Sequence, residues 1–158
     1  MIDGALADRL GAFLEKALEF YRGFLELERK KYEDVAAGRL GELDARMKKE
    51  QAFVLKAKGL DLERQKLMDE TETPRATLRE LLPALPPERR EKARGLYCEL
   101  SCVLEELRRT NGRCQKLTKM RLNQVSRVLS RLEGSPELKR IYGREVADAA
   151  GGRFSEKA

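Results

Sequence analysis

The chain has 158 residues and a net charge of +6, from 33 Lys and Arg against 27 Asp and Glu, and it contains neither His nor Trp. This length is most simply one domain, and its 38% charged and 6% aromatic residues are typical of long, solvent-rich helices rather than of a compact α/β enzyme. Without histidine there is no imidazole base, no His metal ligand and no His-containing triad, and the glycines form no phosphate-binding loop, so we predict a protein that is not an enzyme.

The first residues and the cysteines predict a cytoplasmic location. The chain opens without a basic region or a long apolar run, and its longest uninterrupted apolar stretch covers residues 52–55, so we expect no membrane insertion. Three cysteines are an odd number and do not form a disulfide framework. Cys98 and Cys102 share one helical face but have no second pair at metal-ligand spacing, so we expect small, partly buried apolar residues and no metal site.

The first predicted helix covers residues 3–37 and carries two adjacent apolar stripes. The main stripe has heptad spacing and consists of Leu6, Leu10, Phe13, Ala17, Phe20, Phe24 and Leu27. The second stripe runs one residue later, through Leu14, Leu18, Tyr21, Leu25 and Tyr32. Asp3 is placed to cap the start and Gly38 to end the helix. Two stripes are too wide for a two-stranded seam, so we expect this helix to contact two neighbours.

A second helix is predicted over residues 40–68, followed by a short helical piece. The stripe of the second helix consists of Leu40, Leu43, Met47, Val54 and Ala57, with Phe53, Leu60 and Leu67 beside it. Glu50 interrupts this stripe. The short turn before it predicts that the first two helices are antiparallel neighbours. In residues 77–82, Thr77 and Glu80 have the spacing of a capping box, and Pro83 is expected to end the piece.

A long third helix is predicted from Pro86 and Pro87 to Gly134. Its stripe is apolar as far as Leu107 and then becomes polar or small at Asn111, Cys114, Thr118 and Arg121. Asn111 followed by Gly112 is a turn signal, but the unchanged heptad phase favours a continuous helix. We therefore predict an all-α fold, an antiparallel, coiled-coil-like bundle of three long helices with a short connecting helix. The bundle is a single domain over residues 1–133, and residues 134–158 form a flexible C-terminal tail.

The excess positive charge lies in the second half of the third helix. Eight cations and no acidic residue occur in residues 108–132: Arg108, Arg109, Arg113, Lys116, Lys119, Arg121, Arg127 and Arg131. The same segment carries Leu117, Leu122, Val125, Val128, Leu129 and Leu132. At 1.5 Å per residue the third helix, of about 46 residues, outruns the first by about 20 Å. The end of its apolar stripe should then lack a partner within the chain, and such a stripe indicates a binding surface.

These features resemble the FlgN family, all-helical flagellar export chaperones of bacteria. The resemblance covers the helix-one stripe, the turn at Gly38, the 48–55 stretch, the 77–82 piece and the helix start at Pro87. Its sharpest part is Leu107, Asn111 and Leu117, which are similar to the family's Leu, Asn, Asn, Leu run, with Cys114 in place of the second Asn. Tyr142 followed by Gly143 resembles the family's C-terminal tyrosine segment.

The resemblance implies a function for the exposed end of helix three. Chaperones of this family bind the amphipathic terminal helices of hook–filament junction proteins, prevent premature association and deliver them to the cytoplasmic domain of the export gate, without a cofactor. The expected client-binding residues are Asn111, Cys114, Leu117, Leu122, Val125, Val128, Leu129 and Leu132. The expected charged border of that stripe is Arg113, Lys116, Lys119, Arg127 and Arg131. Tyr142 is the expected contact with the export gate.

Two alternatives from other functional classes stay open at this point. In a structural coiled-coil or adaptor protein, the apolar residues between Leu122 and Leu132 would form a homodimer seam. A basic helical nucleic-acid-binding protein is the weaker alternative. The basic segment, residues 108–132, lacks aromatic residues on which bases could stack, and we expect its cations to be spread around the helix.

Overall fold

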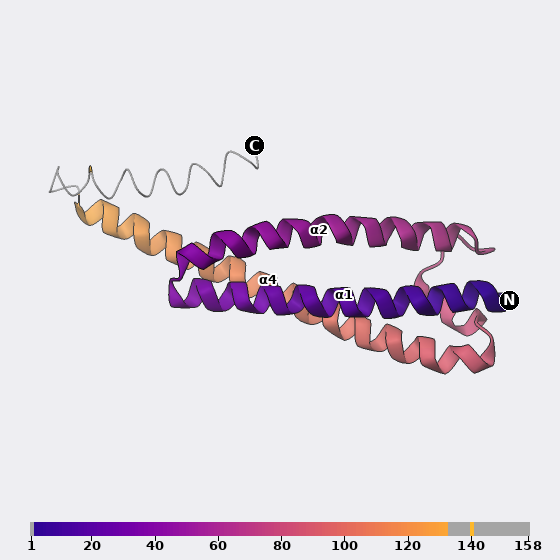
Figure 1. Ribbon diagram of the computed structural model, residues 1–158. Helices are drawn as coiled ribbons and strands as arrows, with labels where there is room; N and C mark the ends of the chain where they lie inside the picture. Colours follow the sequence, from indigo (N-terminus) through magenta and orange to yellow (C-terminus); the bar gives the residue numbers. More distant parts are fainter. Residues whose placement is uncertain (1, 133–139, 141–158) are drawn as a thin grey trace. The chain divides into compact units, whose positions relative to one another are not determined.

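The computed structural model describes residues 2–132 and 140 of the chain (Figure 1). All regular elements among these residues are helices, and the described part contains no strand, which confirms the all-α prediction. The chain divides into two compact units, Met1–Cys114 and Gln115–Ala158. The predicted boundary after residue 133 and the flexible tail lie outside the described residues, so both stay predictions.

Helix α1 covers Gly4–Ala37 and begins and ends at the residues that its sequence predicts. The Asp3 carboxylate accepts a hydrogen bond from the Leu6 backbone N–H at 2.7 Å. At the other end Gly38 has φ +71°, and the N–H groups of Gly38 and Arg39 donate to the carbonyls of Val35 and Asp34. This pairing is a Schellman motif, which needs a left-handed residue and therefore favours glycine.

Both apolar stripes of α1 are buried over much of their length, so the wide face exists as predicted. The buried residues of α1 include Leu6, Leu10, Phe13 and Ala17 from the first stripe and Leu14, Leu18 and Leu25 from the second. The main apolar core gathers at the start of this helix, where it also includes Leu67, Leu82 and Leu100. The first half of α1 thus lies at the centre of the first unit.

Helix α2 covers Leu40–Asp69 and runs antiparallel to α1 along its side (Figure 1). Three ion pairs fix this direction, because the residue numbers fall along α2 and its C-cap Glu70 as they rise along α1. The pairs are Arg9 with Glu70, Lys16 with Glu63, and Lys31 with Glu50. Most of these side chains are exposed, so the pairs set the register more than the stability.

The predicted core stripe of α2 is wrong at two positions. Leu43, Leu60 and Leu67 are buried, whereas Leu40 is 66% and Val54 is 41% exposed. Leu40 is the first residue of α2, directly after the turn. At 3.6 residues per turn Val54 lies only about 20° around the helix from the buried Leu43, so periodicity alone does not separate the two.

Helix α3 covers Leu78–Leu81 and continues as the short 3-10 helix η1, Leu82–Ala84. The predicted capping box is present, since the Glu80 N–H donates to the Thr77 hydroxyl and the Thr77 N–H donates to the Glu80 carboxylate at 2.7 Å. Pro83 is predicted to end this helical piece, but the chain continues through it, and Pro83 lies in the first turn of η1. A proline has no N–H, and a first turn does not require one.

Helix α4 covers Pro87–Arg131 and is continuous through Asn111 and Gly112, as the heptad phase predicts. Within the first unit it runs parallel to α1, because three ion pairs each join residues 77 positions apart: Glu15 with Lys92, Arg22 with Glu99, and Arg29 with Glu106. Successive pairs are one heptad apart, as in a parallel coiled coil. The three-helix bundle as an arrangement of the whole chain stays a prediction.

Candidate functional site

The part of α4 after Cys114 exposes several large apolar side chains to solvent. In residues 115–132, which we call the exposed segment, Met120 is 59%, Leu122 43%, Val125 36% and Val128 51% exposed. Leu117, Leu129 and Leu132 in the same segment are half-buried. Single exposed apolar residues are ordinary, but several on successive turns of one helix indicate a binding surface.

The apolar side chains of the exposed segment share one side of the helix. At about 100° per residue, six of them fall within an arc of about 140°. This apolar arc consists of Leu117, Leu122, Val125, Val128, Leu129 and Leu132. Met120 lies outside it, and Arg121 lies within it and donates a hydrogen bond to the Gln124 side chain at 3.5 Å. An apolar arc of this width is typical of a helix that binds through one face.

The positive charges of the exposed segment lie mainly opposite the apolar arc, which corrects the expectation that they are spread around the helix. Taking Leu122 as the reference, four cations fall between about 60° and 180°. This basic arc consists of Lys119, Lys116, Arg127 and Arg131. Lys119 and Arg131 border the apolar arc, each about 60° from an apolar residue three positions away (Leu122 and Val128). Lys116 and Arg127 lie on the far side. Among the described residues none of the four forms an ion pair.

Three predicted site residues belong to the end of the first unit instead. Asn111 and Arg113 are exposed, whereas Cys114 is only 2% exposed. Cys114 therefore has almost no surface for a client without a local opening of the helix. Its predicted part in client binding stays a prediction, and its observed surroundings are those of a buried polar cluster.

This buried cluster joins charges from α1 and α2 and was not predicted from the sequence. The Lys31 ammonium lies 2.7 Å from a carboxylate oxygen of Glu50 and 3.1 Å from one of Glu28. Glu28 is 1% exposed, and both of its carboxylate oxygens lack a hydrogen-bond partner among the described residues. Two carboxylates therefore share one ammonium in a space that is closed around Glu28 and partly open to solvent at Glu50. The sequence indicates the cluster only indirectly, through Glu50, which interrupts the apolar stripe of α2, and Cys114, which lies where the stripe of α4 becomes polar.

The burial of this cluster shifts two pKa values. Burial raises the pKa of the Glu28 carboxyl above its ordinary value, which outweighs the attraction of Lys31, and the nearby Glu50 charge raises it further. Burial alone would lower the pKa of Lys31, but the hydrogen bond to Glu50 and the attraction of the Glu28 and Glu50 carboxylates, with a smaller contribution from Cys114, together raise it. Lys31 thus stays protonated, and Glu28 is the member of the cluster that resists ionisation.

A second buried carboxylate lies at the turn between α1 and α2. Asp34 is 1% exposed and forms ion pairs with Arg46 and, at 3.3 Å, with Arg39. Asp34 also accepts the Arg39 N–H of the Schellman motif through its backbone carbonyl. With two guanidinium groups for one carboxylate, this pairing stabilises the turn rather than forming a reactive site.

The remaining cysteines and acidic residues do not form a metal site in the described part of the chain. Cys98 and Cys102 are exposed, so the expectation that they are partly buried is wrong, and the predicted absence of zinc ligation is not thereby tested. They sit on the side of α4 that faces away from the core residue Leu100.

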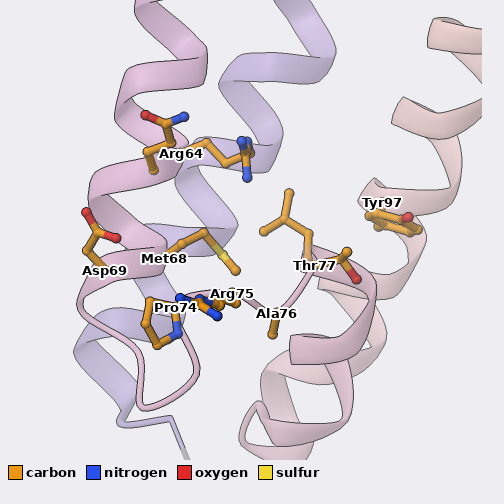
Figure 2. A pocket seen from close by; sticks show the side chains of 10 residues that line it. Arg64, Met68, Asp69, Pro74, Arg75, Ala76, Thr77 and Tyr97 are labelled. Atoms are coloured by element: carbon orange, nitrogen blue, oxygen red, sulfur yellow. The ribbon is translucent and has the colours of Figure 1, made fainter.

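Two hollows in the first unit add a surface that sequence reasoning missed. One, of about 470 Å³, lies between the end of α2, the loop at Pro74–Thr77 and Tyr97 of α4 (Figure 2). The other, of about 540 Å³, lies beside Phe24, Val54 and Leu62. Arg64, in the first hollow, is already paired with Asp61 at 2.9 Å. Neither hollow brings together groups for catalysis.

Tyr142, the predicted export-gate contact, lies outside the described residues. No helix among the described residues is both long and apolar enough to cross a membrane.

Comparisons with known proteins identify the family from nearly the whole chain. No curated protein and no solved structure matches the chain significantly. The family model described as FlgN protein matches residues 1–147, which include all the helices described above. The chain therefore belongs to the FlgN family of flagellar export chaperones.

Proposed function

We propose that this chaperone acts in the cytoplasm, where it binds the amphipathic terminal helices of hook–filament junction proteins and keeps them apart until delivery to the export gate. The observation that carries the proposal is the apolar arc of the exposed segment, of which Leu122, Val125 and Val128 remain exposed. Export chaperones hold their clients without catalysing a reaction. Among the described residues, no group of side chains points to an enzymatic function instead.

The dimensions of the apolar arc suit one client helix. From Leu117 to Leu132 the segment extends about 24 Å at 1.5 Å per residue, which is more than four helical turns. Helix-in-groove recognition uses apolar anchors at spacings of three and four residues, and Leu122, Val125 and Leu129 have these spacings. Each leucine that a client buries should contribute about 1.5–3 kcal/mol.

The cations of the segment have a different part in this proposal. Lys119 and Arg131 border the apolar arc and can contact a client, whereas Lys116 and Arg127 lie too far around the helix to touch the same client helix. Arg113, in the first unit, is exposed and adds to the local positive charge. These charges should speed the encounter with acidic surfaces rather than hold the complex, so salt should lower the association rate and leave dissociation almost unchanged.

Delivery to the export gate is proposed to use Tyr142, on the basis of the family resemblance alone. A tyrosine buries an apolar ring and hydrogen-bonds through its hydroxyl, which suits a protein interface. Tyr142→Ala should preserve folding and client binding but reduce affinity for the cytoplasmic domain of the gate. Calorimetry with the isolated domain measures this, and unchanged affinity would remove Tyr142 from the proposal.

The client surface is tested by Leu122→Ala combined with Leu129→Ala. Co-purification from an extract of flagellated cells first identifies the client, and calorimetry then measures its affinity. The double variant should bind at least about tenfold more weakly, since about 1.4 kcal/mol gives a factor of ten. Leu55→Ala with Leu62→Ala is the matched control, because these leucines are also seven residues apart and are 69% and 59% exposed on α2.

Two results would contradict the proposed client surface. If the control pair lowered affinity and the α4 pair did not, the client would bind to α2. If the chain formed a stable dimer without any client and the α4 pair dissociated it, the apolar arc would be a homodimer seam, as in a structural coiled-coil protein.

A further inference from the structure

The exposed segment combines an apolar arc with a basic arc, and a single client helix covers only the first. Lys116, Arg127 and Arg131 lie about 120° to 180° around the helix from Leu122, and among the described residues they have no acidic partner. No acidic residue occurs anywhere in residues 107–132. The segment therefore presents a positive surface on all but its apolar side.

An anionic bilayer surface is a ligand that fits both arcs at once. A helix lying in the plane of such a surface places its apolar side about 5–10 Å into the boundary between headgroups and acyl chains, while Lys and Arg on its polar side meet the headgroups. The helix itself is about 10 Å across, so anionic headgroups surround it on its sides as well as below. We propose that residues 116–131 of α4 bind peripherally to a membrane surface that contains anionic phospholipids.

The composition of the segment favours a lipid surface over a nucleic acid. Nucleic acid would pair with the cations but would leave Leu122, Val125 and Val128 in water. The segment also contains no aromatic residue on which a base could stack. A bilayer surface uses the charge and the exposed apolar side chains together. Since the apolar arc is also the proposed client surface, a lipid surface and a client helix occupy it alternately.

The proposal is tested by sedimentation of the full chain with vesicles. Vesicles of phosphatidylcholine mixed with phosphatidylglycerol should bind the protein, vesicles of phosphatidylcholine alone should bind it far more weakly, and high salt should reverse the binding. Each cation near an anionic surface contributes about a fivefold change in partitioning, equivalent to about 1 kcal/mol. The triple variant Lys116→Gln, Arg127→Gln and Arg131→Gln should therefore bind about a hundredfold more weakly.

A control with the same change in net charge separates the segment from the whole protein. Lys49→Gln, Lys58→Gln and Lys66→Gln remove three exposed cations of α2 and should change the partitioning by much less. Equal losses in the two triple variants would show adhesion through net charge alone and would overturn the proposal. Circular dichroism confirms that each variant stays helical.

A second pair of variants tests the apolar arc. Leu122→Ser with Val128→Ser should weaken vesicle binding about tenfold or more, whereas Leu55→Ser with Leu62→Ser on α2 should not. Three results would overturn the proposal: no binding of the wild type to anionic vesicles, unchanged binding of the first serine pair, or tighter binding to duplex DNA that the triple α4 variant abolishes. The vesicle experiment contains no client, so its failure leaves the proposed chaperone function untouched.

Discussion

Removing the Lys31 ammonium should destabilise the first unit far more than removing an exposed lysine. Lys31 is 13% exposed and lies between Glu28, which is 1% exposed, and Glu50, which is 28% exposed. Lys31→Met fills similar space but leaves both carboxylates without a counter-ion. Breaking a buried ion pair costs about 3–5 kcal/mol, and the partial exposure of Glu50 places the expected loss near 3 kcal/mol. Lys16→Met is the control, since Lys16 and Glu63 are 61% and 42% exposed and such pairs contribute under about 1 kcal/mol.

Neutralising Glu28 should have the opposite effect at neutral pH. Because burial raises the pKa of Glu28 in the folded state, its stabilising contribution is fully present below the unfolded pKa of about 4.3. That contribution is lost as the pH rises through the folded pKa. Glu28→Gln removes this dependence and leaves the pair of Lys31 with Glu50 intact. The variant should therefore unfold at equal or higher urea concentration than the wild type at neutral pH.

The measurement is urea unfolding, followed by circular dichroism, for the wild type and the three variants between about pH 4 and pH 8. The difference between the wild type and Glu28→Gln isolates Glu28 from carboxylates whose pKa is lowered, such as Glu70 beside Arg9. If Lys31→Met cost no more than Lys16→Met, the cluster would be solvated and the reasoning refuted. A Glu28→Gln variant that was less stable than the wild type at neutral pH would refute it equally.

The remaining predictions concern the caps, the ion pairs and the client. Gly38→Ala should lower the unfolding free energy by about 1–2 kcal/mol in urea titrations, because φ +71° places a side chain in the left-handed region. Thr77→Ala should cost about 1 kcal/mol by the same assay, since it removes the capping box. The single variants Arg22→Ala and Arg29→Ala should each change the free energy of unfolding by less than about 1 kcal/mol, because the side chains of both ion pairs are more than half exposed. In stopped-flow binding, added salt should slow client association and not speed dissociation.

The sequence predicts the helix ends well because local chemistry determines them. Asp3, Gly38 and Thr77 each satisfy backbone groups within four residues of their own position, so no knowledge of the rest of the fold is needed. The continuity of α4 through Gly112 is predicted for a similar reason. One glycine costs a helix only about 1 kcal/mol, and the apolar phase on either side outweighs it.

The sequence predicts less well which side chains are buried, because burial depends on the neighbouring helices. Periodicity marks a face of a helix but not the number of partners that meet it, so Val54 is assigned to the core and is exposed. Charged residues are assumed to face solvent, so the burial of Glu28 and Asp34 is not predicted. The basic arc is not predicted for a simpler reason. The angular positions of its cations can be compared only along an unbroken helix, and the structure shows that α4 is unbroken.

The positions that interrupt the apolar stripes in the sequence have a common cause in the structure. Glu50 interrupts the stripe of α2, and Cys114 lies where the stripe of α4 becomes polar; both act on Lys31 of α1. The main apolar core gathers around the start of α1 and includes Leu100 of α4. At the other end of the first unit a few buried apolar residues, such as Leu27 and Leu43, surround a buried charge cluster. Buried ion pairs stabilise less than apolar packing of the same volume, so this end should open most easily. It adjoins, along α4, the segment that carries the proposed client surface.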